Sequence, residues 1–541
     1  MSSVVERLIE SWLDNQSERR YQPAFIQLLV SLGWKVLHNT RHSPLEMGKD
    51  VIARNPEGQL YCFQLKGNPG GRLTKSEAAV HLVQFIELLE LSPPDRFRKS
   101  QSERHIAVFV TNGNVDEEAT AVFESAGKRT NNSTCAASKY EIWSRGDLIS
   151  MFQQVTGSIW PTTLEGIRRL LNLLASDGRD LPDKMAFTDL LVSTAPIPTS
   201  KTKSPERAAS LASLLVVTEI AKSPWYSTEN HYGLFTMTVL AAVYALRFAD
   251  TKQRLEIVKR YTSLALEHAA DLVNEAQKHD FDPGRTWAAE DMLSEYDIMS
   301  ERRNLVGECA AVLALSENSE IAVDQDYAAE LVEASYRTPQ LWGQAAIPSL
   351  ILRYWVTTRR PGVHLERAFA KQLEAILRAC VDTLPKTRPL PAPYYSFVDC
   401  WAFRNDLPFF SDDGIFTDSF EGRTWFARPM LFMLAKRNWK QTCKLIWPTF
   451  TSVVHEDVDI PDSAFFDCRH CREGLATAFT FHYREWDDLI KEAVDLEKDG
   501  DFLKPFSELS WLIAAYIALV PYRAWAGVLM WLDRRFNLTW Y

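Results

Sequence analysis

Asp50, Gln64 and Lys66 are the residues whose types and spacing could do chemistry. Asp50 directly precedes the short β-type run Val51–Arg54, and a second run, Leu60–Lys66, contains Gln64 and Lys66. An Asn-Pro-Glu-Gly turn separates the two runs. Mg²⁺ prefers oxygen ligands and keeps several waters, so a carboxylate and an amide oxygen can suffice as protein ligands. Lysine supplies a point charge against phosphate or helps to deprotonate an attacking water. The hairpin therefore predicts a site for a divalent cation and a phosphodiester.

Side chains alternate across a strand, so the second run presents two different faces. The faces comprise Tyr61, Phe63 and Leu65 on one side, and Cys62, Gln64 and Lys66 on the other. The apolar set can be buried, whereas the other set places an amide and an ammonium group two residues apart, beside Asp50 of the neighbouring strand. The alternative interpretation is an ordinary hairpin with solvated polar residues.

The segment Gly48–Ala53, followed by Gln64-Leu65-Lys66 with thirteen residues between Asp50 and Gln64, resembles the PD-(D/E)xK nuclease superfamily. Within it the chain resembles the Mrr-like restriction endonucleases, for which the Q-x-K form is typical. Most of the superfamily has Glu or Asp at the position of Gln64, so this site carries one negative charge fewer. The resemblance covers roughly residues 1–154. It implies Mg²⁺- or Mn²⁺-dependent hydrolysis of DNA, with the metal on Asp50 and Gln64 and with Lys66 positioning or activating water.

Family relatives often carry a further glutamate on the helix before the first strand. Here the nearest candidates are Glu18 and Gln22, and spacing does not choose between them. The next helix carries His81 and Gln84, which we interpret as ordinary polar groups. The residues expected to contact nucleic-acid phosphates lie in the loop after Lys66 and in the basic segment 96–104. They are Arg72, Lys75, Arg96, Arg98 and Lys99.

The order of predicted elements over residues 1–154 is α-β-β-β-α-β-α-β, which fits a mixed sheet flanked by helices. Glycine at 33 is expected to end the second helix, and Thr74 with Glu77 is expected to form a capping box at the start of the next. The strongly apolar run His105–Val110 and the run Tyr140–Trp143 are the later strands. Residues 155–205 form a connector that ends in a Pro/Ser/Thr-rich linker.

From residue 206 onward, amphipathic helical patterns dominate, which predicts an all-α domain built as a bundle or an α-solenoid. Its long, aromatic and acidic segment Pro385–Arg423 is expected to form a lid or a recognition surface. The apolar run Trp511–Leu532 is interrupted by Pro521 and Arg523, so we expect two buried helices and no membrane span.

Composition bounds the remaining possibilities. A chain of 541 residues with 46% hydrophobic residues and 17 tryptophans is a multidomain globular protein. Its net charge of −10 excludes an overall basic nucleic-acid binder, although residues 1–154 balance 18 Lys/Arg against 18 Asp/Glu. Because the eight cysteines are scattered and no secretory signal opens the chain, we expect a cytoplasmic location.

The sequence thus predicts an α/β restriction-endonuclease-like domain at 1–154 and a helical sensor, regulatory or interaction domain at 206–541. By analogy with the family, the expected role is DNA cleavage in restriction or anti-phage defence. DNA is the expected partner, together with a trigger or partner protein at the helical domain, and we expect a homo-oligomer. The alternative is a degenerate nuclease fold that only binds nucleic acid or protein, within a helical scaffold.

Overall fold

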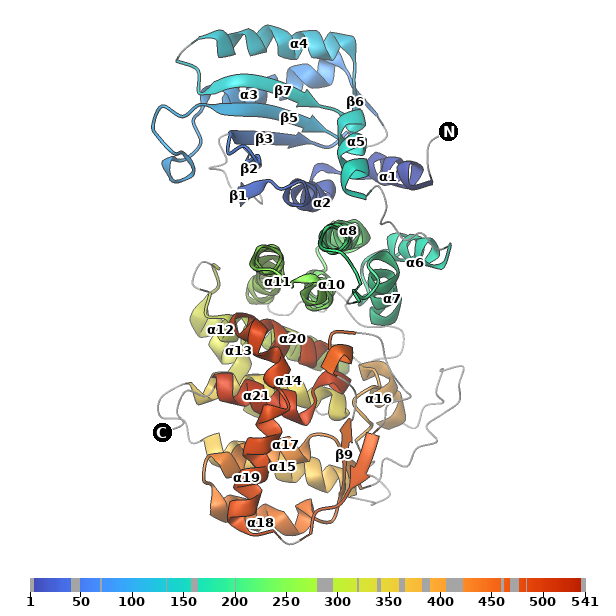
Figure 1. Cartoon of the computed structure of the whole chain (residues 1–541), viewed down its shortest axis with the longest axis vertical. Coiled ribbons are helices and arrows are strands. Elements are labelled where there is room, and N and C mark those ends of the chain that lie inside the picture. Colours follow the sequence, from blue (N-terminus) through green and yellow to red (C-terminus); the bar gives the residue numbers. More distant parts are fainter. Residues whose placement is uncertain are drawn as a thin grey trace. The chain divides into compact units, whose positions relative to one another are not determined.

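The structure is a computed structural model of the chain, shown in Figure 1. It describes residues 4–39, 49–68, 71–132, 134–156, 164–199, 201–279, 295–318, 321–337, 342–359, 365–381, 390–404, 422–458, 462–467, 476–482 and 484–536. Gly48, one of the residues on which the resemblance rests, lies outside these residues, as do two residues of the loop after Lys66.

The chain divides into two compact units, which are described separately. The first comprises Met1–Gly178, Asp189–Glu229 and Arg247–Ile257, and the second comprises Arg179–Thr188, Asn230–Leu246 and Val258–Tyr541. These bounds differ from the expected boundaries at residues 154 and 205. The physical reason is that α8 (Ser204–Ala221), which follows the expected linker, packs against α2 (Glu18–Ser31) and α5 (Arg145–Thr156) of the first unit.

The first unit is built around a mixed sheet of order β1-β2-β3-β5-β7. Strands β1, β2 and β3 are antiparallel neighbours, whereas β5 runs parallel to both β3 and β7. The strands are β1 (Lys35–Asn39), β2 (Val51–Arg54), β3 (Leu60–Lys66), β5 (His105–Thr111) and β7 (Ala137–Trp143), with β4 (Arg72–Leu73) paired to β6 (Asn114–Val115). The remaining helices are α1 (Val4–Asp14), α3 (Lys75–Glu90), α4 (Glu117–Gly127), α6 (Leu164–Leu174) and α9 (Ser223–Thr228).

Helices cover both faces of this sheet (Figure 1). On one face Cys62 belongs to an apolar core that also contains Phe85 of α3 and Phe123 of α4. On the other face the Phe63 ring packs edge-on against Phe25 of α2, with 5.5 Å between ring centroids. The predicted alternation of β3 is therefore confirmed, but the face that carries Gln64 and Lys66 is covered as well. As a result every residue of β3 is buried.

The local signals for helix ends behave as expected in the first unit. Gly33 follows α2 with φ +86°, a conformation that glycine adopts without steric penalty. Thr74 and Glu77 form the expected capping box, in which the Thr74 N–H donates to Glu77 Oε2 at 2.8 Å. The capping box fixes where α3 starts, directly after β4.

The second unit is largely helical. Two helices, α7 (Lys184–Thr194) and α11 (Lys252–His279), are each divided between the two units. The helices that lie wholly in the second unit are α10 (His231–Ala245), α12 (Glu295–Ser316), α13 (Gln325–Arg337), α14 (Ile347–Thr358), α15 (Leu365–Val381), α16 (Phe397–Arg404), α17 (Ala427–Lys436), α18 (Lys440–Phe450), α19 (Trp486–Lys498), α20 (Ser510–Leu519) and α21 (Ala526–Phe536). The expectation of an all-α domain was incomplete. A small sheet of order β10-β9-β8 joins β8 (Arg423–Thr424), β9 (Val454–Val458) and β10 (Ala476–Phe479).

The C-terminal apolar run is broken where proline and arginine interrupt it. α20 ends at Leu519, and Pro521–Arg523 form a short 3-10 turn before α21 begins. Arg523 is fully buried and donates to the backbone oxygen of Asp467 at 2.7 Å. Within the described residues, the helical stretch Asp501–Leu519 is long and apolar enough to cross a membrane, but 67% of it is buried inside the protein. The expected pair of buried helices is therefore confirmed.

Candidate active site

Asp50 and Gln64 meet at the start of β2. The antiparallel register pairs Val51 with Phe63, which places Asp50 opposite Gln64 on the neighbouring strand. The Gln64 amide Nε2 donates to Asp50 Oδ2 at 2.7 Å, and the Leu65 N–H donates to the same oxygen at 2.6 Å. Asp50 is 8% exposed and Gln64 is 3% exposed, so water contributes little to solvating either group.

The Gln64 amide oxygen is the unusual atom of this pair. Its Nε2 faces the Asp50 carboxylate, because only the N–H side of the amide can donate to that group, so Oε1 faces elsewhere. Oε1 is buried and accepts no hydrogen bond from any described residue. Buried acceptors are normally satisfied, so an exception suggests a missing ion or water. A buried amide oxygen with no donor, in a residue that contacts a carboxylate, can accept a hard cation.

Lys66 lies at the end of β3, on the same face as Gln64, and contacts Glu18 in the first turn of α2. Its Nζ is 3.2 Å from Glu18 Oε2, and the two side chains retain 10% and 26% of their exposure. The accessible edge of the site therefore lies at this ion pair and not at the Asp50–Gln64 pair. Of the two candidates on α2, Glu18 makes this contact, whereas Gln22 is partly buried on the same helix.

Two other residues bring the start of α2 to the end of β3. A Cβ atom on Gly67 would lie 2.4 Å from the Glu18 backbone nitrogen, so only glycine permits this approach. Asn112, which follows β5, is fully buried. Its Nδ2 donates at 2.7 Å to the backbone oxygens of Leu13 and Gln16, while its Oδ1 accepts from the Asn68 N–H at 2.7 Å. Asn112 thereby joins the α1–α2 connection to the end of β3.

Tyr21 of α2 lies close to the ends of β3 and β5. Its hydroxyl is 3.2 Å from the backbone oxygen of Lys66 and 3.4 Å from that of Val110. Burial raises the pKa of Tyr21 well above its usual value, and the nearby carboxylates of Glu18 and Asp50 raise it further. The hydroxyl consequently remains protonated and acts as a donor that holds α2 against the sheet.

His81 is a residue of this region that the sequence interpretation assigned no role. It lies on α3, which covers the Gln64 face, and its ring centroid is 6.3 Å from that of Phe109, the register partner of Gln64. Burial lowers the pKa of His81, and the positive charge of Lys66 lowers it further. The imidazole is therefore neutral at pH 7. A lone histidine on a helix carries no spacing pattern that would have identified it.

The candidate phosphate-contacting residues fall at two different ends of the sheet. Arg72 and Lys75 follow the Lys66 end, and their side chains are 74% and 67% exposed, at 3.9 Å from Asp116 and 3.6 Å from Glu118, respectively. Lys99 instead donates to the Gly58 backbone oxygen at 3.2 Å, in the β2–β3 turn.

Arg96 and Arg98 belong to the same turn-proximal segment as Lys99. The Arg96 guanidinium lies 4.7 Å from the centre of the Phe97 ring, and Arg98 pairs with Asp95. A seven-residue strand spans roughly 20 Å. This segment therefore lies about that far from Lys66, whereas Arg72 and Lys75 lie near it.

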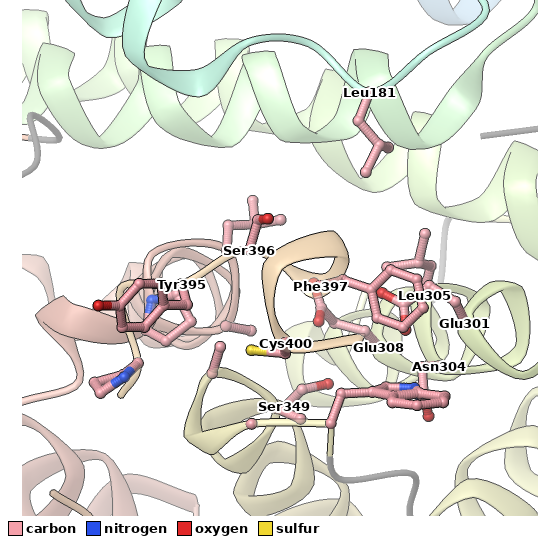
Figure 2. Close-up of a pocket in the computed structure, with 18 of the residues that line it drawn as sticks. Leu181, Glu301, Asn304, Leu305, Glu308, Ser349, Tyr395, Ser396, Phe397 and Cys400 are labelled. Carbon is pink, nitrogen blue, oxygen red and sulfur yellow. The ribbon is translucent and has the colours of Figure 1, made fainter. Parts of the chain in front are cut away.

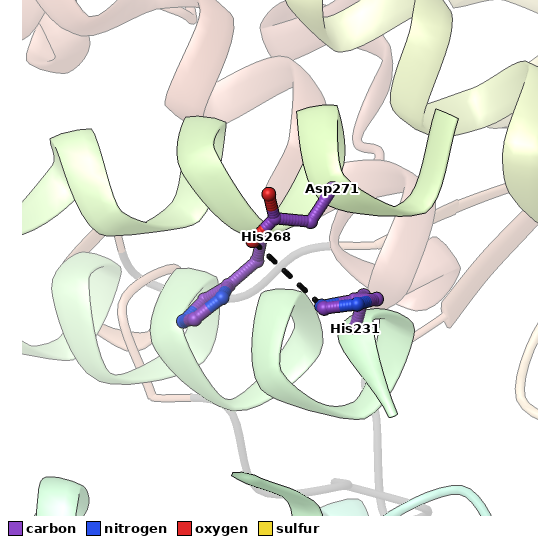
Figure 3. Close-up of side chains that lie close together, drawn as sticks. All are labelled: His231, His268 and Asp271. Carbon is purple, nitrogen blue, oxygen red and sulfur yellow. Dashed lines mark ion pairs between the residues drawn. The ribbon is translucent and has the colours of Figure 1, made fainter. Parts of the chain in front are cut away.

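A separate cluster in the second unit contains His231, His268 and Asp271 (Figure 3). Their ligand-type atoms lie within 4.8 Å of one another, and Glu275 Oε2 is 3.8 Å from His231 Nε2. Adjacent ligands around a tetrahedral zinc ion are roughly 3.3 Å apart. As placed, these side chains form a polar group with histidine–carboxylate contacts of 3.8 Å and not a closed metal site.

No protein-family model matches this chain, and no curated protein or solved structure resembles it at a significant level.

Proposed function

We propose that the first unit is a metal-dependent nuclease that hydrolyses phosphodiester bonds of DNA, as the resemblance to the Mrr-like branch implies. The observation that carries the proposal is the buried Gln64 Oε1, which has no described hydrogen-bond donor, on an amide whose Nε2 donates to the Asp50 carboxylate. The ion pair of Lys66 with Glu18 at the accessible edge supports it.

The donor set fits the expected cofactor. Asp50 and Gln64 would hold Mg²⁺ or Mn²⁺ through one carboxylate and one neutral amide oxygen, and such an ion would take its other ligands from water and substrate. Such an ion would polarise the scissile phosphate and increase the acidity of a bound water. Because Gln64 is neutral, the protein supplies less negative charge than a site with two acids, which favours binding of the metal together with phosphate.

Lys66 is the residue proposed to act on the phosphate. Its ammonium lies at the accessible edge, where the Glu18 carboxylate holds it in place before substrate arrives. A phosphate oxygen that replaces Glu18 would gain a charge-assisted hydrogen bond, which strengthens as negative charge develops on the phosphate. His81 adds no positive charge at neutral pH that would compete with the metal.

The approach of DNA is proposed to follow the exposed cations near this edge. Arg72 and Lys75 retain most of their exposure, so they can contact phosphates on either side of the scissile bond. Lys99 and its neighbours lie roughly 20 Å from Lys66, which corresponds to about six base pairs of duplex. They would therefore contact DNA only at a distance of about six base pairs from the scissile bond. By analogy with the family, the helical unit is proposed to regulate cleavage in restriction or anti-phage defence.

The direct test is incubation of the purified full-length protein with supercoiled plasmid and with phage DNA, in Mg²⁺, Mn²⁺ or EDTA. We expect nicked or linear product with either metal and none in EDTA. Lys66→Ala and Asp50→Ala should each reduce the rate on the order of 10²–10³-fold. Lys139→Ala removes an exposed lysine of β7 that pairs with Glu141, so it is the matched control and should cleave like wild type. DNA that is bound but never cut with either metal, with Lys66→Ala indistinguishable from wild type, would refute catalysis.

One observation favours a second candidate function, binding without cleavage. Asp50 Oδ2 already accepts two hydrogen bonds, and Lys66 already has a carboxylate partner. A polar group satisfied in this way can be purely structural. In that case DNA affinity should depend on Arg72 and Lys75 and should be unaffected by chelation of metal.

A further inference from the structure

The second unit contains a partly open cavity of about 1040 Å³, shown in Figure 2. Ligand pockets for drug-sized molecules typically measure about 300–1,000 Å³, so this volume admits a small organic molecule with some water. The cavity is bounded by the start of α7, by α12 and α14, and by residues 393–400, which lead into α16. These last residues lie in the segment that the sequence singled out as a recognition surface.

One wall of the cavity is a polar stripe along α12. Glu301, Asn304 and Glu308 are spaced three and four residues apart, which places them on one face of the helix. On α14 the cavity is lined by Ser349 and Arg353, four residues apart. Arg353 joins the two helices by donating from Nη2 to the Asn304 backbone oxygen at 2.6 Å. A polar stripe between packed helices replaces the apolar contacts that would otherwise stabilise them.

Four charged groups meet at this cavity, two acidic and two basic: Glu301, Glu308, Lys184 and Arg353. In the described part of the chain, no ion pair within 4 Å joins any of the four to another. Their hydrogen bonds go to neutral groups: Tyr232 O–H donates to Glu308 at 3.3 Å, and Lys184 donates to the Leu519 backbone oxygen at 2.8 Å. Arg353 Nε is buried with no described acceptor.

Glu308 and Arg353 are buried, Glu301 is half-buried, and Lys184 as a whole residue is exposed. Loss of solvent around the charged ends disfavours the charged form of each group. It raises the pKa of Glu301 to about 7 and raises that of Glu308, while it lowers the pKa values of Lys184 and Arg353. Buried charges are normally retained only when they are paired or functional. A ligand that brought the complementary charges would compensate all four at once.

The lining also contains flat aromatic surfaces. Trp342, Tyr394, Tyr395, Phe397 and Tyr522 line the cavity, and the Trp342 and Phe397 rings meet edge to face at 5.4 Å. Aromatic side chains pack well against planar rings. The lining therefore combines a surface for a flat ring with groups of both charges.

We propose that this cavity binds a small ligand that carries an anionic group together with N–H donors, one of them on or beside a flat ring. Arg353 and Lys184 bind the anionic group, and Glu301 and Glu308 accept from the N–H donors. A ligand of a single charge sign would leave either the two acids or the two bases uncompensated. Mononucleotides and aromatic amino acids both have this chemistry. The binding is independent of phosphodiester cleavage, so it stands or falls separately from the nuclease proposal.

The test is titration calorimetry of the full-length protein with two sets of probes: the purine and pyrimidine mononucleotides, and tryptophan, tyrosine and phenylalanine. We expect saturable binding below about 1 mM for members of one set, and which set binds identifies the source of the ligand. Arg353→Gln and Glu308→Gln should each weaken that binding about tenfold or more. The control pair Arg359→Gln and Glu317→Gln removes an ion pair of the same unit outside the cavity lining and should bind like wild type.

A third variant guards against loss of folding in the buried substitutions. Leu181 is 37% exposed and lines the cavity, so Leu181→Trp should fill space without removing a charge. It should abolish binding while leaving the thermal unfolding temperature near that of wild type. Failure of every probe to bind, or equal affinity in wild type and Leu181→Trp, would overturn the proposal. Binding that persists unchanged in both Arg353→Gln and Glu308→Gln would overturn it too.

Discussion

Glu18 Oε2 lies 3.2 Å from Lys66 Nζ, although 48 positions separate the two residues in the sequence. The first turn of α2 and the last residue of β3 are thereby joined at an edge of the candidate site that retains exposure. This pair determines where the ammonium lies before any substrate binds, and it gives Glu18 a role that its helix position alone does not.

Glu18→Gln should slow metal-dependent cleavage by about 10–100-fold, the usual effect of removing a group that orients an active-site residue. The glutamine side chain has nearly the shape of glutamate, but it lacks the negative charge that holds the Lys66 ammonium. Cleavage rates under single-turnover conditions measure the effect. Glu103→Gln is the matched control, because it breaks the Arg54 ion pair of 2.7 Å in the same unit but close to the far end of β3. A rate that falls equally in both variants would indicate a general loss of stability.

Gln64→Glu tests the metal ligand directly. The substitution removes the 2.7 Å hydrogen bond to Asp50 and places two buried carboxylates side by side, so the metal-free protein should lose about 1–3 kcal/mol of stability. Bound Mg²⁺ would compensate both charges. The thermal unfolding temperature should therefore rise more steeply with Mg²⁺ concentration in Gln64→Glu than in wild type. If Mg²⁺ affects neither protein, the pair does not hold a metal.

The hairpin and the alternation of β3 could be predicted because they depend on neighbouring residues. The Asn-Pro-Glu-Gly turn and the period-two pattern define β2 and β3 to the residue. The choice between Glu18 and Gln22 could not be made, because it depends on how close α2 comes to β3. The small Gly67 and the buried Asn112 set that distance through contacts far apart in sequence.

Other features lacked any local signal. His81 is a single residue whose relation to Lys66 arises only when α3 packs on the sheet. The strands of the small sheet are short, and β8 has two residues, so no alternation could develop. The cavity charges on α12 and α14 resemble ordinary surface positions of amphipathic helices until the helices are packed. The observed unit boundary differs from the predicted one for a similar reason, because α8 packs on α2, a helix more than 170 positions earlier in the sequence.

Gly67→Ala should destabilise the first unit by about 1–3 kcal/mol, because the new Cβ would lie 2.4 Å from the Glu18 nitrogen and α2 would have to shift. The Lys66–Glu18 contact should be lost with it, and cleavage should fall. Gly146→Ala is the control: it lies within α5, and its Cβ would meet only the Ser144 hydroxyl at 3.9 Å. That variant should be as stable as wild type or slightly more stable. Urea unfolding of both variants checks the difference.

The last prediction concerns acid stability. His105 of β5 is fully buried, and its Nε2 donates to the Leu88 backbone oxygen at 2.8 Å. Burial, and after it the positive charge of Lys49, lower the pKa of His105 from 6.5 to about 4. Between these values the unfolded chain binds a proton that the folded chain does not, so stability should decrease as pH falls from 6.5 to 4. The pKa difference corresponds to about 3 kcal/mol at most.

His105→Gln removes this titration while keeping an amide that can donate to Leu88. Hydrogen exchange of the β5 amides, measured by mass spectrometry at pH 7 and pH 4.5, reports the stability of the first unit specifically. His455 of the second unit also has a burial-lowered pKa of about 4, so it serves as the internal comparison. In His105→Gln the β5 amides should lose less protection on acidification than in wild type, whereas the amides of β9 should lose the same protection in both proteins. An unchanged acid response in β5 would mean that His105 is not the group whose protonation opposes folding.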